Sequence, residues 1–351
     1  MAAATRLSDE VRIAFDNLVD TVTGGTTPTL RLGVTGLSRA GKTVFITALV
    51  HNLIYGGRLP LFGAYAEGRL ADAELQPQPD DAVPRFAYED HVRDLVQRRI
   101  WPQSTRQISE LRLTIHYESA RMLKRRLGPG TLHLDIVDYP GEWLLDLPLL
   151  NQSFAEWSES ALALARAEGR AEAAAPFLSA LGQAAPLAEL DEPQAQALTA
   201  AFKDYLAAAR AAGFSGCAPG RFLMPGELEG SPALTFCPLP KPETRPKGDS
   251  LYAAFERRFE AYKRIVVKPF FRDHFARIDR QIVLVDALGA IRAGPRAVED
   301  LRVAMADILS AFRPGKNTWL SRILTRRVER VAFAATKADH LHHSQHAALA
   351  H

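Results

Sequence analysis

Eight consecutive residues near the beginning of the chain have the types and spacing that bind a chain of phosphates. Residues 36–43 read G-L-S-R-A-G-K-T, which matches G-x-x-x-x-G-K-T, between an apolar run at 30–35 and a helix-compatible run at 44–54. Gly36 and Gly41 carry no Cβ, so the backbone can turn tightly and approach an anion. The N–H groups of the loop and of the following helix N-terminus can then face the phosphates. The segment predicts a P-loop, and an ordinary glycine-rich turn is the alternative.

The side chains of this segment have distinct expected roles. Lys42 supplies a positive charge for the β- and γ-phosphates, and the Thr43 hydroxyl is a ligand for Mg²⁺. Charge that develops during phosphoryl transfer also needs a cation, so Arg39 is a catalytic candidate beside Lys42. Arg99 and Arg106 are further candidates for this cation, and an ordinary solvated arginine is the alternative for each. The nucleotide contacts expected from the segment are Gly36, Ser38, Arg39, Ala40, Gly41, Lys42, Thr43 and Val44.

A second motif follows an alternating, strand-like run at 132–138. Residues 138–141 read D-Y-P-G, a D-x-x-G pattern at the end of a strand. Asp138 in this place can hold a water on Mg²⁺, and the Gly141 N–H can reach a γ-phosphate. A turn is the alternative, because Asp-x-Pro-Gly also suits turn geometry.

A third motif follows the last strand-like run, at 328–335. Residues 336–339 read T-K-A-D, which resembles the guanine-reading N/T-K-x-D pattern. Asp339 can accept two hydrogen bonds from the N1–H and exocyclic amine of guanine, which adenine does not offer. The stem of Lys337 can lie over the plane of the base, and Thr336 completes the group. A helix N-terminus with ordinary surface charges is the alternative.

The segment 101–106 is expected to supply a further metal ligand. Thr105 could bind Mg²⁺ and touch the γ-phosphate, so that the loop is ordered only with a triphosphate. Ser104 is the rival residue, and an N-cap of the next element is the alternative to both.

The predicted elements place these motifs in an α/β fold. A strand at 30–35 and a helix at 44–54 precede an irregular stretch at 56–84 and a helix at 86–100. Alternating runs at 111–117 and 132–138 predict an antiparallel pair, and alanine-rich packed helices follow from 144 to 213. After an irregular stretch, a helix at 251–276 is interrupted at Pro269. Buried-type strands at 281–285 and 328–335 flank a helix at 298–312.

We therefore expect a mostly parallel sheet with one antiparallel strand pair and an inserted helical domain. The expected division is 1–143 and 276–351 for the nucleotide domain, with 144–275 as the mainly helical insertion. No strand pattern follows Asp339, so the last strand and helix of such a domain are expected to be missing.

Composition narrows the class of protein. The chain has 351 residues, 47% of them hydrophobic, and a formal net charge of +3, an excess too small to indicate nucleic-acid binding. Its two cysteines form no disulfide framework, so a reduced cytoplasmic protein is expected. We see neither a signal peptide nor an apolar run long enough to cross a membrane. A basic cluster around 121–126 could touch anionic lipid, but a solvated turn is favoured. The histidines at 340–351 are expected to be solvated rather than to bind zinc.

Several segments together resemble the YcjX-like family of bacterial P-loop GTPases. They are residues 34–43, 99–102 with Thr105, 135–143, 267–270 with 279–286, and 335–339. The resemblance implies a Ras-like nucleotide domain with a helical insertion, binding of GTP and GDP, Mg²⁺, and a stress-associated cytosolic role.

One departure from the Ras-like pattern concerns catalysis. The residue after D-x-x-G is usually a glutamine that orients the attacking water, whereas here it is Glu142. A triphosphate repels a carboxylate, which could act as a base only from further away, so we expect slow intrinsic hydrolysis.

The main hypothesis is a Mg²⁺-dependent GTPase switch, with guanine nucleotide and an unidentified effector or activating protein as partners. An ATP-dependent kinase or ATPase and a nucleotide-binding scaffold without significant turnover are the alternatives.

Overall fold

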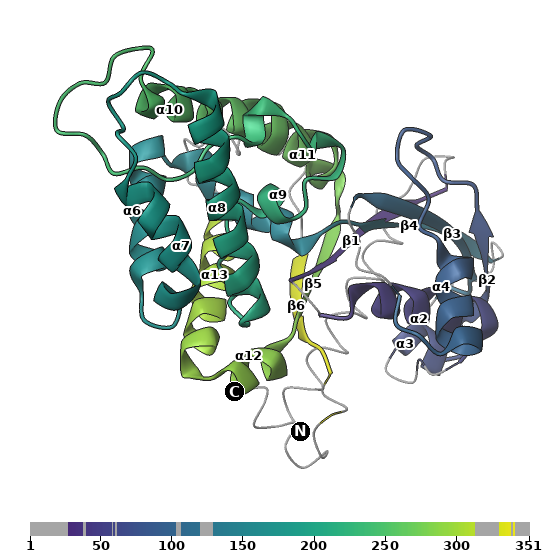
Figure 1. Ribbon diagram of the computed structural model, residues 1–351. Helices are drawn as coiled ribbons and strands as arrows, with labels where there is room; N and C mark the ends of the chain where they lie inside the picture. The colour runs from purple at the N-terminus through teal and green to yellow at the C-terminus, as the bar shows by residue number, and fades with distance from the viewer. Residues whose placement is uncertain are drawn as a thin grey trace.

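The computed structural model describes residues 27–37, 40–57, 59, 62–102, 107–119, 129–312, 330–337 and 340. Figure 1 shows a twisted sheet, with a group of helices beside β5 and β6 and the helices α2, α3 and α4 beside β1 to β4. Among the described residues, no helix has the length and apolar character needed to cross a membrane.

The sheet has the mixed topology that the sequence predicts. Its strands are β1 (Thr29–Gly36), β2 (Leu70–Gln76), β3 (Ser109–Tyr117), β4 (Gly130–Asp138), β5 (Arg280–Val285) and β6 (Arg330–Ala335). Their order is β2-β3-β4-β1-β5-β6, and β4, β1, β5 and β6 pair in parallel. The predicted antiparallel pair is confirmed as β3 with β4, where Leu111 faces Ile136. The mostly parallel α/β fold class is therefore confirmed, with β3 running against its neighbours.

Apolar burial explains how the first helix covers the sheet. Helix α2 (Lys42–Tyr55) buries Ile46, Val50 and Leu53, which belong to the same apolar cluster as Leu111 and Leu113 of β3. These residues recur at helical spacing on α2, so one stripe of the helix meets the sheet. The cluster fixes the start of α2 over the sheet, next to Gly41 of the predicted P-loop.

The prediction of an irregular stretch at 56–84 was wrong in part. This stretch contains α3 (Gly63–Ala66) and the edge strand β2, which pairs antiparallel with β3. Asp72 and Glu74 are exposed while Ala73 is buried, so β2 has only a weak apolar alternation. An edge strand buries one face at most, which leaves little signal in its sequence. The helix expected at 86–100 is present as α4 (Tyr88–Arg93) and a π-helical turn, η1 (Asp94–Arg98).

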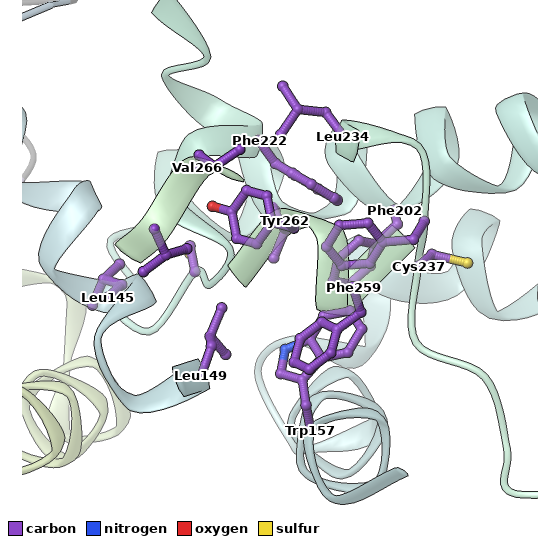
Figure 2. Packing of buried hydrophobic residues seen from close by; sticks show 14 of the residues in the cluster. Leu145, Leu149, Trp157, Phe202, Phe222, Leu234, Cys237, Phe259, Tyr262 and Val266 are labelled. Atoms are coloured by element: carbon purple, nitrogen blue, oxygen red, sulfur yellow. The ribbon is translucent and has the colours of Figure 1, made fainter. Parts of the chain in front are cut away.

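Between β4 and β5 the chain is mainly helical, as the alanine-rich composition of 144–213 predicts, and the stretch expected to be irregular, 215–250, holds only short helical turns. The elements are η2 (Gly141–Asp146), η3 (Pro148–Asn151), α6 (Phe154–Arg166), α7 (Ala171–Gly182), α8 (Glu192–Ala211), α9 (Gly220–Leu223), η4 (Gly226–Leu228), η5 (Pro232–Leu234), α10 (Leu251–Tyr262), η6 (Lys263–Val267), α11 (Lys268–Asp273) and η7 (Phe275–Arg277). Figure 2 shows the aromatic centre of this region, where the rings of Trp157 and Phe259 stack with their centroids 5.1 Å apart. We call residues 148–277 the helical region.

The helix predicted at 298–312 is confirmed as α13 (Pro295–Phe312), which follows the short α12 (Ala287–Ala293). Figure 1 shows α13 among the helices of the helical region. Asp300 of α13 pairs with the fully buried Arg170 and accepts hydrogen bonds from the Ser215 and Gly216 N–H groups at 2.6 and 2.9 Å. The division at 143 and 275 stays a prediction, and α13 packs across its second boundary.

Candidate functional site

The loop after β1 has the strand–loop–helix context that the sequence predicts. β1 ends at Gly36 and α2 begins at Lys42. Gly41 has a φ of +73°, where a side chain would be strained. A Cβ on Gly36 would lie 3.0 Å from the Cβ atoms of both Ala40 and Leu284. The two glycines therefore suit this backbone path for different reasons, one conformational and one steric.

The lysine of this loop meets the second motif at the neighbouring strand. Lys42 Nζ lies 2.5 Å from Asp138 Oδ1 and donates a hydrogen bond to the Tyr139 carbonyl oxygen at 2.7 Å. Thr35 Oγ1 donates to the same carbonyl at 3.0 Å. The contact arises because β1 and β4 are adjacent and parallel, with Val34 opposite Asp138. The carboxyl ends of parallel strands meet at one sheet edge, which brings the two motifs together.

Gly141 of the second motif lies directly against the first. A Cβ added to Gly141 would stand 2.3 Å from the Gly36 carbonyl oxygen and 2.8 Å from the Leu37 nitrogen. Both of these atoms are backbone atoms, so a side chain could be accommodated only by moving the chain. The glycine therefore allows the two backbones to approach.

The residue after this glycine pairs with the helical region. Glu142 is 6% exposed, and its Oε1 lies 2.6 Å from Nη2 of Arg210, in the last turn of α8. The segment that carries Glu142, η2, is buried over its whole length. Glu142 thus lies beside the 36–43 loop with a cation of the helical region as its partner.

An aromatic residue fixes the same segment to α9 and the chain after it. Trp143 Nε1 donates a hydrogen bond to the Met224 carbonyl oxygen at 3.1 Å. The guanidinium carbon of Arg221 lies 3.2 Å from the centre of the Trp143 ring, a cation–π contact. Phe270 packs edge to face on Trp143 with ring centroids 5.0 Å apart, and the Arg221 guanidinium carbon lies 5.7 Å from the Phe270 ring centre.

The last residue of η2, Asp146, has a buried carboxyl group. Asp146 accepts hydrogen bonds from the Gly220 N–H and the Tyr262 hydroxyl, each at 2.7 Å. Burial raises the pKa of Asp146 to about 6, while the two hydrogen bonds favour the charged form. Gly220 also lies so close to Glu142 that an added Cβ would be 1.8 Å from the Glu142 carbonyl oxygen.

The third motif follows β6 at the same sheet edge. The Thr336 N–H donates to the Val285 carbonyl at 2.9 Å, which continues the pairing of β6 with β5. Lys337 has a φ of +61°, and its Nζ lies 2.5 Å from Asp286 Oδ2. The other oxygen of Asp286 accepts from the Gly289 N–H at 2.9 Å and caps α12. The first two residues of the motif are therefore held by a hydrogen bond to β5 and by an ion pair with the residue that caps α12.

One cavity of about 830 Å³ joins the described parts of all three motifs. Its wall consists of Gly36, Leu37, residues 40–45, Trp101, Pro102, residues 140–142, Arg210, Met224, Leu284, residues 334–337 and His340. Its volume is within the range of sites for small organic ligands. Asp138 is not part of the wall and lies behind Lys42, with which it pairs.

Several predicted site residues lie outside the described residues, and their roles stay predictions. They are Ser38, Arg39, Ser104, Thr105, Arg106 and Asp339. Arg99 is described, and its side chain is exposed at the end of η1, with no part in the cavity wall. The structure therefore gives no support for Arg99 as this cation, and Arg39 and Arg106 stay predictions.

The sequence analysis missed two residues of the site. Arg210 lies in the run A-A-A-R of α8, where nothing local distinguishes it from a solvated helix residue. The fully buried Tyr139 presents its carbonyl to Lys42, and its hydroxyl donates to Gln281 Oε1 at 2.8 Å. The position of Tyr139 in D-Y-P-G was the available signal, because the residue after an aspartate at the end of β4 must lie near the loop that follows β1.

Comparison with known proteins identifies the family. Residues 30–351 match the model of the YcjX-like family, DUF463. The chain belongs to this family. It is 42% identical over 332 residues to the Ras-like GTPase YcjX of Escherichia coli, covering 91% of this chain and 71% of that protein. It is 38% identical over 340 residues to the Ras-like GTPase YcjX of Shewanella oneidensis, covering 90% of this chain and 70% of that protein. The predicted membership of the YcjX-like family is thus confirmed.

Proposed function

We propose that this protein is a GTPase that binds GTP and GDP, requires Mg²⁺ and hydrolyses GTP slowly by itself. The observation that carries the proposal is the cavity whose wall includes Lys42, Gly141 and Thr336, one residue from each motif. The two YcjX relatives are named Ras-like GTPases, which supports the same activity here. A cytoplasmic, stress-associated role follows from the family resemblance and belongs to this proposal.

The three motifs suggest how the nucleotide is held. Lys42 and the backbone of the 36–43 loop bind the phosphates, and the Gly141 N–H reaches the γ-phosphate. Thr336, Lys337 and Asp339 read the guanine base. Hydrolysis is slow because a carboxylate, Glu142, replaces the glutamine that usually orients the attacking water.

The donor atoms near the phosphate positions suit Mg²⁺. Thr43 is part of the cavity wall, and the Asp138 carboxylate lies beside Lys42. Among the described residues, no group of three or more His, Cys, Asp or Glu could hold a metal by itself. Mg²⁺ commonly takes one or two protein oxygens and completes its octahedron with phosphate oxygens and waters. Thr43, Asp138 and Thr105 would hold the ion, which neutralises charge on the β- and γ-phosphates.

Base selectivity is the first test. Isothermal titration of nucleotide-free protein in Mg²⁺ buffer should give ADP binding at least about a hundredfold weaker than GDP binding, roughly 2.7 kcal/mol. Asp339→Asn should reduce this ratio, while Glu299→Gln, a change of an exposed carboxylate on α13, should leave it unchanged. Equal affinity for GDP and ADP would favour an ATP-dependent enzyme, and binding of neither would contradict the proposal.

Nucleotide binding should depend on the loop lysine. Lys42→Ala should abolish GDP and GTP binding because it removes the charge that faces the phosphates, whereas Lys241→Ala at an exposed site should not. Tight GTP binding by Lys42→Ala contradicts the assignment. Single-turnover hydrolysis by the parent protein that equals that of Asp138→Ala would instead favour a scaffold without turnover.

A further inference from the structure

Glu142 and Arg210 form an ion pair at the boundary between two cavities. Both residues line the 830 Å³ cavity and also a smaller one of about 120 Å³. Leu37, which follows Gly36, is part of both walls as well. The pair therefore lies beside the 36–43 loop and connects it to the end of α8.

The position of Glu142 creates an electrostatic problem for a triphosphate. Glu142 directly follows Gly141, whose backbone lies against Gly36 of the loop. A γ-phosphate bound there would approach a buried carboxylate of the same sign. Repulsion between like charges is strong where water is excluded, because the effective dielectric constant is low.

The geometry of the Glu142–Arg210 ion pair indicates how this repulsion can be reduced. Glu142 Oε1 is buried and accepts no aligned hydrogen bond from the described residues, although Arg210 Nη2 is 2.6 Å away. The side chain of Arg210 is 22% exposed against 8% for Glu142, so the cation lies on the more open side. Its place in the last turn of α8 also favours a cation, because the helix dipole is negative there.

We propose that Arg210 is a positioning residue that compensates the charge of Glu142 and holds its carboxylate so that a triphosphate can bind beside it. This inference rests on the proposed GTPase function and extends it, because it explains how the site tolerates a carboxylate after D-x-x-G. It assigns the helical region a direct part in distinguishing GTP from GDP. Only the γ-phosphate comes close to Glu142, so GDP binding is insensitive to the pair.

The proposal is tested with a slowly hydrolysed GTP analogue and with GDP, both titrated in Mg²⁺ buffer. Arg210→Ala should weaken binding of the analogue at least about tenfold, which corresponds to about 1.4 kcal/mol, and change GDP binding less than about twofold. Arg210→Lys keeps the charge and should retain most of the affinity for the analogue.

A rescue experiment separates charge compensation from other roles of the arginine. Adding Glu142→Gln to Arg210→Ala removes the uncompensated carboxylate, so analogue affinity should return to within about threefold of the parent protein. An arginine that only stabilised the reacting phosphate would give no such rescue. Glu142→Gln alone should raise the affinity for the analogue relative to GDP, since Arg210 then faces the phosphates without a partner.

Arg258→Ala is the matched control. Arg258 lies in α10 of the same helical region, pairs with Glu192 at 2.5 Å and is 18% exposed, but it is not part of either cavity wall. Arg258→Ala should leave the affinities for GDP and for the GTP analogue unchanged. Equal weakening of GDP and analogue binding by Arg210→Ala, or a double variant no better than Arg210→Ala, overturns the proposal. If the parent protein binds no guanine nucleotide, the proposed function itself has failed, which is a separate result.

Discussion

Replacing Gly220 by alanine tests how closely η2 packs on the helical region. The new Cβ would lie 1.8 Å from the carbonyl oxygen and 2.4 Å from the carbonyl carbon of Glu142. The first distance is about 1.6 Å short of the 3.4 Å at which ordinary contact begins. Both atoms belong to the backbone, so η2 or α9 must move, and no side-chain rotation relieves the contact.

The cost of this substitution follows from the overlap. Overpacking of a buried site costs about 1–3 kcal/mol, and a clash with rigid backbone belongs at the upper end of that range. A loss of about 2–3 kcal/mol lowers Tm by roughly 5–10 °C in a domain of this size. Movement of Glu142 should also slow single-turnover GTP hydrolysis, while GDP binding at the 36–43 loop stays within about threefold.

Urea unfolding and single-turnover hydrolysis measure the two effects. Gly182→Ala is the control, because a Cβ at the end of α7 meets nothing within 4 Å. It should be neutral or slightly stabilising, since alanine favours a helix over glycine by about 1 kcal/mol. If the free energy of unfolding of Gly220→Ala is within about 0.5 kcal/mol of that of the parent protein and the variant hydrolyses GTP normally, the close packing of η2 on Gly220 is refuted.

Three further predictions concern other contacts of the site and its support. Gly141→Ala should weaken GDP binding about tenfold or more, as seen by titration, because its Cβ would stand 2.3 Å from the Gly36 carbonyl oxygen. The raised pKa of Asp146, about 6 against a usual 3.8, gives stability that is full below about pH 4 and is lost as pH rises through about 6. The free energy of unfolding of Asp146→Asn, measured in urea relative to that of the parent, should therefore increase by about 2–3 kcal/mol from pH 4 to pH 8. A difference that does not change with pH would contradict this. Arg170→Met should cost about 3–5 kcal/mol because it leaves the Asp300 carboxylate, which is 9% exposed, without its cation, and unfolding midpoints equal to the parent would exclude this.

The strands and motifs were predictable because their signals are local. β1 and β5 contain apolar runs and β4 alternates, and each strand ends at or just before a glycine or aspartate, so the strands and the loops after them could be located from sequence. The glycines at 36, 41 and 141 signal a particular backbone path, and the structure shows a positive φ or a close approach at each. β2 escaped prediction because an edge strand with Asp72 and Glu74 exposed leaves no clear alternation.

The sequence by itself determined the family, the α/β class and the order of three motifs, because each depends on residues adjacent in the chain. Only the tertiary structure decided that Glu142 pairs with Arg210, that Gly220 packs on Glu142, and that η2 is buried by the helical region. Such contacts join segments far apart in sequence, and local propensity carries no information about them. They depend on how apolar burial stacks the helices beside the sheet, which decides which charged side chains meet.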